Sequence, residues 1–259
     1  MSQNLEIQTK YQDLVKELRS RLAPELHDRY DDDMLLRALL AKKKDLKVAM
    51  NILVKYTMAR KDYPGLFGSA IDGHMEGIIG STMSFNPQFL TPAGHHLLFL
   101  KALDWDPKKH SLETLLKSIV IGSEYKSLDY AAQEKGFVLV VDARDMGWKY
   151  VWAIKPALVH AFAQLLVFYL PVNLQNIVVY NTNWAVEMIW KMIVPLIPAE
   201  LAQKVVLCGS SREKLAFFVS PEAAESESFI PTQEMRREYA REILSHDHVV
   251  QSLRTRYMI

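Results

Sequence analysis

The chain has 259 residues, of which 31 are basic, 30 are acidic and 49% are hydrophobic, with a formal net charge of +1. Such a length suits one large domain or two modest ones with an ample core, and so balanced a charge gives no indication of nucleic-acid binding. Cys208 is the only cysteine, which excludes an internal disulfide framework. The N-terminal sequence is not of the secretory type, and no apolar run approaches the ~20 residues of a membrane span. We therefore expect a soluble, cytoplasmic protein.

Residues 1–68 are predicted to form an all-helical module. Asp31 or Asp32 can cap a second helix and Asp45 a third, because a carboxylate accepts the free N–H groups of a first turn. We expect Lys42–Lys44 to form a solvated turn between these helices. The first helix is indicated by apolar residues at helical spacing, before Pro24: Ile7, Tyr11, Leu14, Val15, Leu18 and Leu22.

Residues 69–96, with four glycines between 73 and 94, are predicted to be an irregular linker. His95 and His96 are adjacent, and neighbouring residues point in opposite directions on a strand. No cysteine or acidic residue lies near them at ligand spacing. We therefore expect no metal site and no cofactor.

After residue 96, strands and helices alternate. The helices are expected from Ser111 to Gln133, from Pro156 to Tyr169 and from Asn183 to Val194. This alternation predicts an α/β fold, in which a mostly parallel sheet flanked by helices follows the N-terminal helical module. The predicted strands are HLLFLKAL, FVLVVD, QNIVVY and KVVLC.

Catalytic signals are weak. No phosphate-binding glycine motif follows a strand, and Gly209–Ser211 does not match the G-x-S-x-G pattern of a nucleophile elbow. Asp142 and Asp145 follow a buried strand, but we interpret them as loop and capping groups. His246–His248 is interpreted as solvated. We expect a protein that is not an enzyme.

The helix predicted from Asn183 to Val194 has two apolar faces. At 100° per residue, Glu187 and Lys191 form a narrow polar seam between them. The helix is either a core element between two layers or a lid over a bound lipid, and at about 18 Å it is too short to cross a bilayer. The first face contains Val186, Ile189, Trp190 and Ile193, and the second contains Trp184, Ala185, Met188 and Met192.

Three stretches, in this order, resemble the CRAL-TRIO family of lipid-binding proteins, and within it the branch that carries tocopherol and retinaldehyde. DDDMLLRALLAKKKDLKVAMNILVKYTMARKDYPGLF is similar to the family's helical module, FVLVVDARDMGW to its strand-plus-aspartate segment, and LPVNLQNIVVYNTNWAVEMIWKMIVPLIPAEL to its strand, gate helix and proline segment. The resemblance implies a helical module (1–68), a lipid-binding domain (69–220) with a mobile gate helix (183–194), and a C-terminal extension (221–259) that we expect to be helical. It also implies a protein that shields and carries a lipid but catalyses no reaction.

The resemblance also implies site residues. Ser123 would be a lone hydroxyl for a ligand head group. A phosphate-binding cleft of the family would keep only one basic residue here, Lys204. The other basic positions of that cleft are occupied by Asn173, Gln175 and Glu200, so we expect phosphoinositide binding to be weak. Membrane contacts fall on Trp148, Trp152, Ala185 and Met192. Ligand contacts fall on Leu100, Leu116, Ile119, Ser123, Phe137, Ile154, Leu165, Leu166, Ile177, Val186, Ile189, Trp190 and Ile193.

The leading hypothesis is a carrier that transfers a small hydrophobic ligand, such as a tocopherol, retinoid, carotenoid or other terpenoid, through transient contact with a membrane. The first alternative is exchange of phosphatidylinositol or another phospholipid. A regulatory module with a vestigial pocket is a second alternative, weakened because no further signalling domain fits in 259 residues. A hydrolase would need a nucleophile and base that the sequence does not offer. The C-terminal arginines, including Arg236, Arg254 and Arg256, are expected to be solvated.

Overall fold

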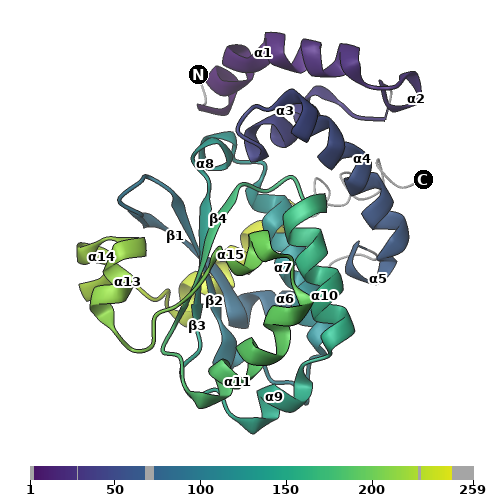
Figure 1. Cartoon of the computed structure of the whole chain (residues 1–259). Helices are drawn as coiled ribbons and strands as arrows, with labels where there is room; N and C mark the ends of the chain where they lie inside the picture. The colour runs from purple at the N-terminus through teal and green to yellow at the C-terminus, as the bar shows by residue number, and fades with distance from the viewer. Residues whose placement is uncertain (1–2, 28, 68–72, 227–228, 247–259) are drawn as a thin grey trace.

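A computed structural model describes residues 3–27, 29–67, 73–226 and 229–246 of the chain. Its N-terminal part is helical, as predicted, and α1 lies across α3 at one end of the molecule (Figure 1). Asp31 and Asp45 are the N-caps of α3 and α4, and each accepts a backbone N–H bond of 2.9 Å. The helices are α1 (Gln3–Arg21), α2 (Pro24–His27), α3 (Asp32–Ala41), α4 (Leu46–Asp62) and α5 (Pro64–Phe67).

The rest of the chain is built on a five-stranded sheet in the order β1-β2-β3-β4-β5. Only β1 is antiparallel to its neighbour, and the other three pairings are parallel. The predicted fold class, a helical region followed by a mostly parallel sheet flanked by helices, is confirmed. The strands are β1 (Met83–Leu90), β2 (His96–Lys101), β3 (Phe137–Asp142), β4 (Leu174–Tyr180) and β5 (Val205–Leu207).

The sheet separates two helical layers (Figure 1). On one face, α13 and α14 cover a small core around Val138, Val140 and Val178. The larger core and most of the other helices lie on the opposite face. The remaining elements are α6 (Gly73–Thr82), η1 (Ala102–Asp104), α7 (Leu112–Lys126), α8 (Tyr130–Lys135), α9 (Trp148–Ala153), α10 (Pro156–Gln164), the π-helix η2 (Leu165–Tyr169), α11 (Trp184–Ile193), η3 (Val194–Leu196), α12 (Ala199–Ala202), α13 (Arg212–Val219), α14 (Pro221–Glu225) and α15 (Gln233–Ser245).

Two predictions of secondary structure were wrong. The segment expected to be an irregular linker contains α6 and the edge strand β1, because packing of buried Ile78 and Ile79 outweighs the low helix propensity of the glycines. The helix expected from Ser111 to Gln133 is two helices, since Asp129 caps α8 by accepting the N–H of Ala132 (3.0 Å).

The C-terminal helix α15 packs on α6 and β1. The approach is close: a Cβ at Gly80 would lie 3.3 Å from the Cβ of Ala240. Arg236, expected to be solvated, is buried, and it donates to the Pro231 carbonyl (2.7 Å) and to Asp104 (3.0 Å). Its partners come from distant or irregular segments, which sequence periodicity does not register. Arg254, Arg256 and most of the His246–His248 stretch lie outside the described residues.

The turn Lys42–Lys44 is not the solvated loop that was expected. Lys42 donates to the Val167 carbonyl (3.2 Å), and Lys44 lies 3.1 Å from Glu134. Only Lys43 is exposed. Lys43 and Lys44 both have positive φ (51° and 65°), a conformation in which non-glycine residues are uncommon. Tertiary contacts of two of the three lysines hold this turn against the rest of the chain.

Glu134 joins the N-terminal helices to α8. Lys10 and Lys44 each lie 3.1 Å from its carboxylate, and Tyr11 donates a hydrogen bond to it. Burial disfavours ionisation, but these bonds outweigh it and lower the pKa of Glu134 to about 2.

A depressed carboxyl pKa stabilises the fold above the pKa of the unfolded chain, near 4.5. We therefore expect this contribution to unfolding free energy to be complete at neutral pH and to be lost as the pH falls from about 4.5 to about 2. Urea unfolding at several pH values would measure it. In Glu134→Gln, that part of the acid sensitivity should disappear, and an unchanged pH profile would contradict the assignment.

Candidate ligand-binding site

An apolar cavity of about 280 Å³ lies on the larger side of the sheet, between β4, β5, α10 and α11. Its size is near the lower end of the range for small-molecule sites, about 300–1,000 Å³. Every lining side chain is apolar or an indole. They are Ala102, Trp105, Leu112, Leu115, Val141, Ala143, Met146, Ile154, Val159, Phe162, Ala163, Leu166, Ile177, Val179, Val186, Ile189, Trp190, Ile193, Ile197, Leu201, Val205 and Leu207.

The local sequence explains why these side chains converge. Ile177 and Val179 are two apart on β4 and therefore point to the same face of the sheet. In α10 and η2, the lining positions 159, 162, 163 and 166 follow helical spacing. On α11 the lining residues are the first apolar face identified in the sequence, Val186, Ile189, Trp190 and Ile193.

The structure brings seven of the thirteen expected ligand-contact residues to this cavity: Ile154, Leu166, Ile177, Val186, Ile189, Trp190 and Ile193. It places the other six in the packed core or its edge, outside the cavity lining. These are Leu100, Leu116, Ile119, Ser123, Phe137 and Leu165. On α7 the cavity reaches only Leu112 and Leu115, so Ser123, more than two turns further on, does not offer its hydroxyl there.

Sequence reasoning missed fifteen lining residues, among them those of β5 and α10. Val205 and Leu207 alternate on β5, and Val159, Phe162 and Ala163 follow the helical period of α10. The signal was therefore present as periodicity. Periodicity identifies an apolar face without saying whether that face meets a packed layer or a cavity.

Helix α11 is attached to its surroundings at both ends. At its start, the side chain of Asn183 accepts from the N–H of Ala185 (3.0 Å) and donates to the Met146 carbonyl (2.9 Å). Just past its end, His160 of α10 donates to the Leu196 carbonyl (2.5 Å). Asn181 precedes the helix with a positive φ of 56° and donates to buried Asp142 (2.7 Å). Asp142 thus has a structural partner, although it is the last residue of β3 rather than a loop residue.

Three indoles gather on the outside of α9 and α11. Trp148, Trp152 and Trp184 are 54%, 80% and 48% exposed. The ring of Trp148 lies 6.3 Å from that of Trp152 and 4.7 Å from that of Trp184. We call these three residues the tryptophan cluster. Trp184 was not among the expected membrane contacts.

The other two expected membrane contacts differ. Met192 is exposed, but Ala185 is completely buried and cannot touch a bilayer in this conformation. Ala185 lies in the first turn of α11, where the adjacent Trp184 occupies the outer surface instead. None of the helices among the described residues has the length and apolar character to cross a membrane.

Lys204, the expected phosphate contact, donates to the Leu174 carbonyl (2.7 Å). Burial lowers its pKa, and so does repulsion from Lys43, while Glu200 opposes the change. Burial lowers the pKa of Lys42 in the N-terminal lysine turn, and repulsion from Lys204 lowers it further. Asn173 is buried and bonded to the backbone of Gln133 (3.0 Å).

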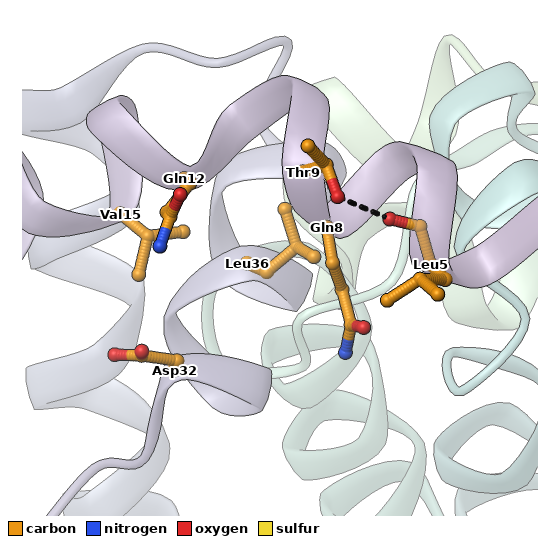
Figure 2. A pocket seen from close by; sticks show the side chains of 7 residues that line it. All are labelled: Leu5, Gln8, Thr9, Gln12, Val15, Asp32 and Leu36. Atoms are coloured by element: carbon orange, nitrogen blue, oxygen red, sulfur yellow. Dashed lines mark hydrogen bonds between the residues drawn. The ribbon is translucent and has the colours of Figure 1, made fainter.

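A second hollow, of about 290 Å³, lies between α1 and α3. Figure 2 shows that Gln8, Thr9, Gln12 and Asp32 contribute polar side chains to it, and Thr9 uses its hydroxyl to bond the Leu5 carbonyl (2.9 Å). This mixed lining contrasts with the apolar cavity below α11. No group of three potential metal ligands occurs within the part of the chain that the structure describes.

A family model described as the CRAL/TRIO domain matches residues 88–228. This range contains the end of β1, strands β2 to β5 and helix α11. The chain belongs to the CRAL/TRIO family. Domains of the CRAL/TRIO family bind hydrophobic lipid ligands and are generally not enzymes.

Similar proteins in the CRAL/TRIO family include clavesin-2 of Rattus norvegicus and of Homo sapiens, each 25% identical over 224 residues, or 85% of this chain and 68% of the relative. Clavesin-1 of Xenopus laevis is 23% identical over 233 residues, covering 85% of this chain and 67% of the relative. The crystal structure of Sfh5 aligns with a TM-score of 0.50 and 12% identity over 95% of this chain and 96% of that one. At this identity the likeness to Sfh5 concerns the fold alone.

Proposed function

We propose that this protein binds one small hydrophobic lipid in the cavity below α11 and transfers it between membranes, with α11 as the gate helix. An isoprenoid such as a tocopherol, retinoid, carotenoid or other terpenoid is the favoured cargo. The observation that carries the proposal is the pairing of an apolar cavity, which α11 covers, with an exposed tryptophan cluster on the outside of α11 and the neighbouring α9. Val186, Ile189, Trp190 and Ile193 face the cavity, while Trp184 lies outside.

The two sides of α11 suit the two environments of a carrier. Burial of an apolar ligand contributes roughly 25 cal/mol of binding free energy for each Å² of its surface that is removed from water. A cavity with an apolar lining can therefore hold such a ligand without polar contacts. Indoles suit the edge of a bilayer, because the ring is apolar while its N–H can stay hydrated. The bonds of Asn183 and His160 hold the gate helix closed, and Asn181 is the position where its leading end would bend.

The carrier function predicts stoichiometric uptake of one ligand. At a free ligand concentration of 100 Kd, binding to the folded state adds about 2.7 kcal/mol to the unfolding free energy, and the midpoint of thermal unfolding should rise by several degrees. Mass spectrometry of extracted lipid, together with thermal unfolding against a panel of tocopherols, retinoids, carotenoids, sterols and phospholipids, would test this. Failure of the whole panel to bind would refute the proposal.

The alternative, exchange of phosphatidylinositol, predicts a basic head-group cleft. Here Asn173 and Gln175 are neutral, Glu200 is acidic, and the ammonium group of Lys204 already donates to a carbonyl. Lys42, which lies near Lys204, donates to the Val167 carbonyl. We therefore expect weak, salt-sensitive binding to phosphoinositide vesicles.

Sedimentation with vesicles of phosphatidylcholine, with and without phosphoinositide, would measure the head-group preference. We expect the affinities for the two kinds of vesicle to differ by less than about fivefold at 150 mM salt, where exposed charges more than ~8 Å apart are largely screened from each other. Strong selectivity that disappears in Lys43→Gln together with Lys204→Gln would show that the lysine turn completes a phosphate site, and would favour the alternative.

A further inference from the structure

The two ends of the apolar cavity differ in burial. The cavity runs across the sheet, from Ala102, which follows β2, to Val205 and Leu207 on the edge strand β5. At the β2 end the lining is buried, with Trp105 only 3% exposed and Leu112 only 5%. At the β5 end, Val205 and Leu207 are only half-buried. The lining is therefore more accessible at the β5 end, and the β2 end is closed.

Trp105 forms part of the closed end and is held in place by its surroundings. Its ring nitrogen donates to the His110 carbonyl (2.9 Å). Its ring lies 5.9 Å from that of Tyr150, which is completely buried and donates from its hydroxyl to the Leu103 carbonyl (2.9 Å). Turning the indole aside would leave a buried N–H without its partner, which is unfavourable. A long ligand therefore does not easily displace this ring.

The space does not continue past the closed end along α7. Leu115 lines the cavity, whereas Ile119 and Ser123 lie about one and two helical turns further on. Both were expected to contact a ligand, but they are 7% and 8% exposed and lie outside the cavity lining. Side chains of the main core fill the region where a longer cavity would extend.

The volume of the cavity limits how much of a ligand it can hold. The cavity has about 280 Å³, and a water molecule occupies about 30 Å³ in the liquid. A methylene group is of similar size, so about nine or ten carbon atoms fill the space. Small-molecule sites bury about 70–90% of a ligand's surface, so the matching ligand has roughly 10 to 15 carbon atoms.

Building on the carrier function, we propose that Trp105 limits the length of the cargo, so that the cavity selects compact apolar lipids of roughly 10 to 15 carbon atoms. Among terpenoids these are molecules of about two or three isoprene units. The inner end of such a ligand contacts the indole of Trp105. A longer lipid inserts one end only, and the carbon atoms that remain at the β5 end add little to its affinity.

The proposal predicts a break in the relation between affinity and chain length. Each methylene group that leaves water should raise the affinity by about fourfold, whereas one that stays outside should leave it almost unchanged. In a series of straight-chain alcohols of about 6 to 20 carbon atoms, we expect the fourfold steps to end at roughly 10 to 15. Titration calorimetry on the full chain, with each alcohol kept below the concentration at which it aggregates, would measure the break.

Shortening the side chain at position 105 should move the break to longer ligands. Trp105→Leu removes about six heavy atoms from the closed end, so the break should shift by about four to six carbon atoms. Trp105→Phe removes about three heavy atoms and should shift it by about two or three. The second variant disturbs the packing less, and it keeps the test decisive if the first does not fold.

Phe229→Ala is the matched control. It also removes about six heavy atoms from a side chain that is 3% exposed, but Phe229 belongs to the small core on the opposite face of the sheet. This substitution should lower the unfolding free energy and leave the break where it is. A shift of the break in Phe229→Ala would show that loosening of the fold, rather than the wall at Trp105, changes the preferred length, and would overturn the proposal.

The remaining outcomes separate this proposal from the carrier function. If no alcohol of the series and no lipid of the wider panel binds, the carrier function itself fails. If the affinity keeps rising about fourfold per methylene group up to about 20 carbon atoms, the limit on length is overturned while the carrier function stands. An unchanged break in both Trp105 variants would likewise overturn the role of this indole.

Discussion

Replacing Trp148 and Trp152 together with alanine is expected to weaken association with phosphatidylcholine vesicles by roughly 100-fold, or ~2.7 kcal/mol. Full burial of one large apolar side chain contributes about 1.5–3 kcal/mol, and these two rings are 54% and 80% exposed in the free protein. Neither ring lines the cavity, so equilibrium ligand affinity should stay within about twofold of the original. Ligand transfer to vesicles should slow in proportion to the lost association.

Phe217 provides the matched control for this experiment. It is also 80% exposed, but it lies on α13, which covers the opposite face of the sheet from α9 and α11 (Figure 1). Phe217→Ala should leave vesicle association unchanged, whereas Met192→Asp, on the exposed side of α11, should weaken it. Equal losses of ligand affinity and of transfer in the tryptophan variant would mean that these indoles support the fold rather than contact a membrane.

The largest effect on stability is expected for Arg37. This arginine is completely buried on α3, where its guanidinium group lies 3.2 Å from Asp33 and donates to Ser127 of the α7–α8 connection (3.0 Å). Arg37→Met preserves much of the side-chain volume but removes the donor to Ser127 and the cation beside Asp33. Asp33 is 31% exposed and keeps a hydrogen bond from Tyr130, so we expect a loss of about 1.5–3 kcal/mol, the range for hydrogen bonds to a charged group, which urea unfolding at pH 7 would measure.

Arg19 offers a comparison within the same helical module. It pairs with Asp32, the neighbour of Asp33, at 2.7 Å, but that aspartate is largely exposed. Arg19→Met should therefore reduce the unfolding free energy by only about 0–1 kcal/mol. A similar small loss for both variants would show that Arg37 is not required to hold the N-terminal helices against α7.

The sequence predicted those features that depend on neighbouring residues. Asp45 was recognisable as a helix cap, Asp31 as one of two candidates for another, and Ser111 as the start of a helix. The apolar strand FVLVVD and the two-faced helix after Asn183 were recognisable from their patterns. The order of these segments was enough to predict the fold class. Each of these signals spans fewer than about twenty residues, the range in which periodicity and capping act.

The misassigned features depend on contacts between distant segments. Gly80 is favourable in α6 because Ala240 packs there, 160 positions later, and Arg236 is buried because Asp104 lies 132 positions earlier. The extent of the cavity is a similar case. Ile119 and Ser123 share α7 with Leu112 and Leu115, but only the latter two face open space, which depends on how side chains from other elements fill the interior.

The packing of α15 has a consequence for the choice of a minimal folding unit. The family match ends at residue 228, yet α15 begins only at Gln233 and contributes Tyr239, Ala240 and Ile243 to the main core. A chain truncated after residue 228 would expose the apolar surfaces of α6 and β1 that this helix covers. It would also free Asp104 from Arg236, and Asp104 ends the short η1 segment whose Ala102 lines the cavity. We therefore expect the C-terminal helix to be needed for the shape of one wall of the apolar cavity, although it lies outside the range of the family match.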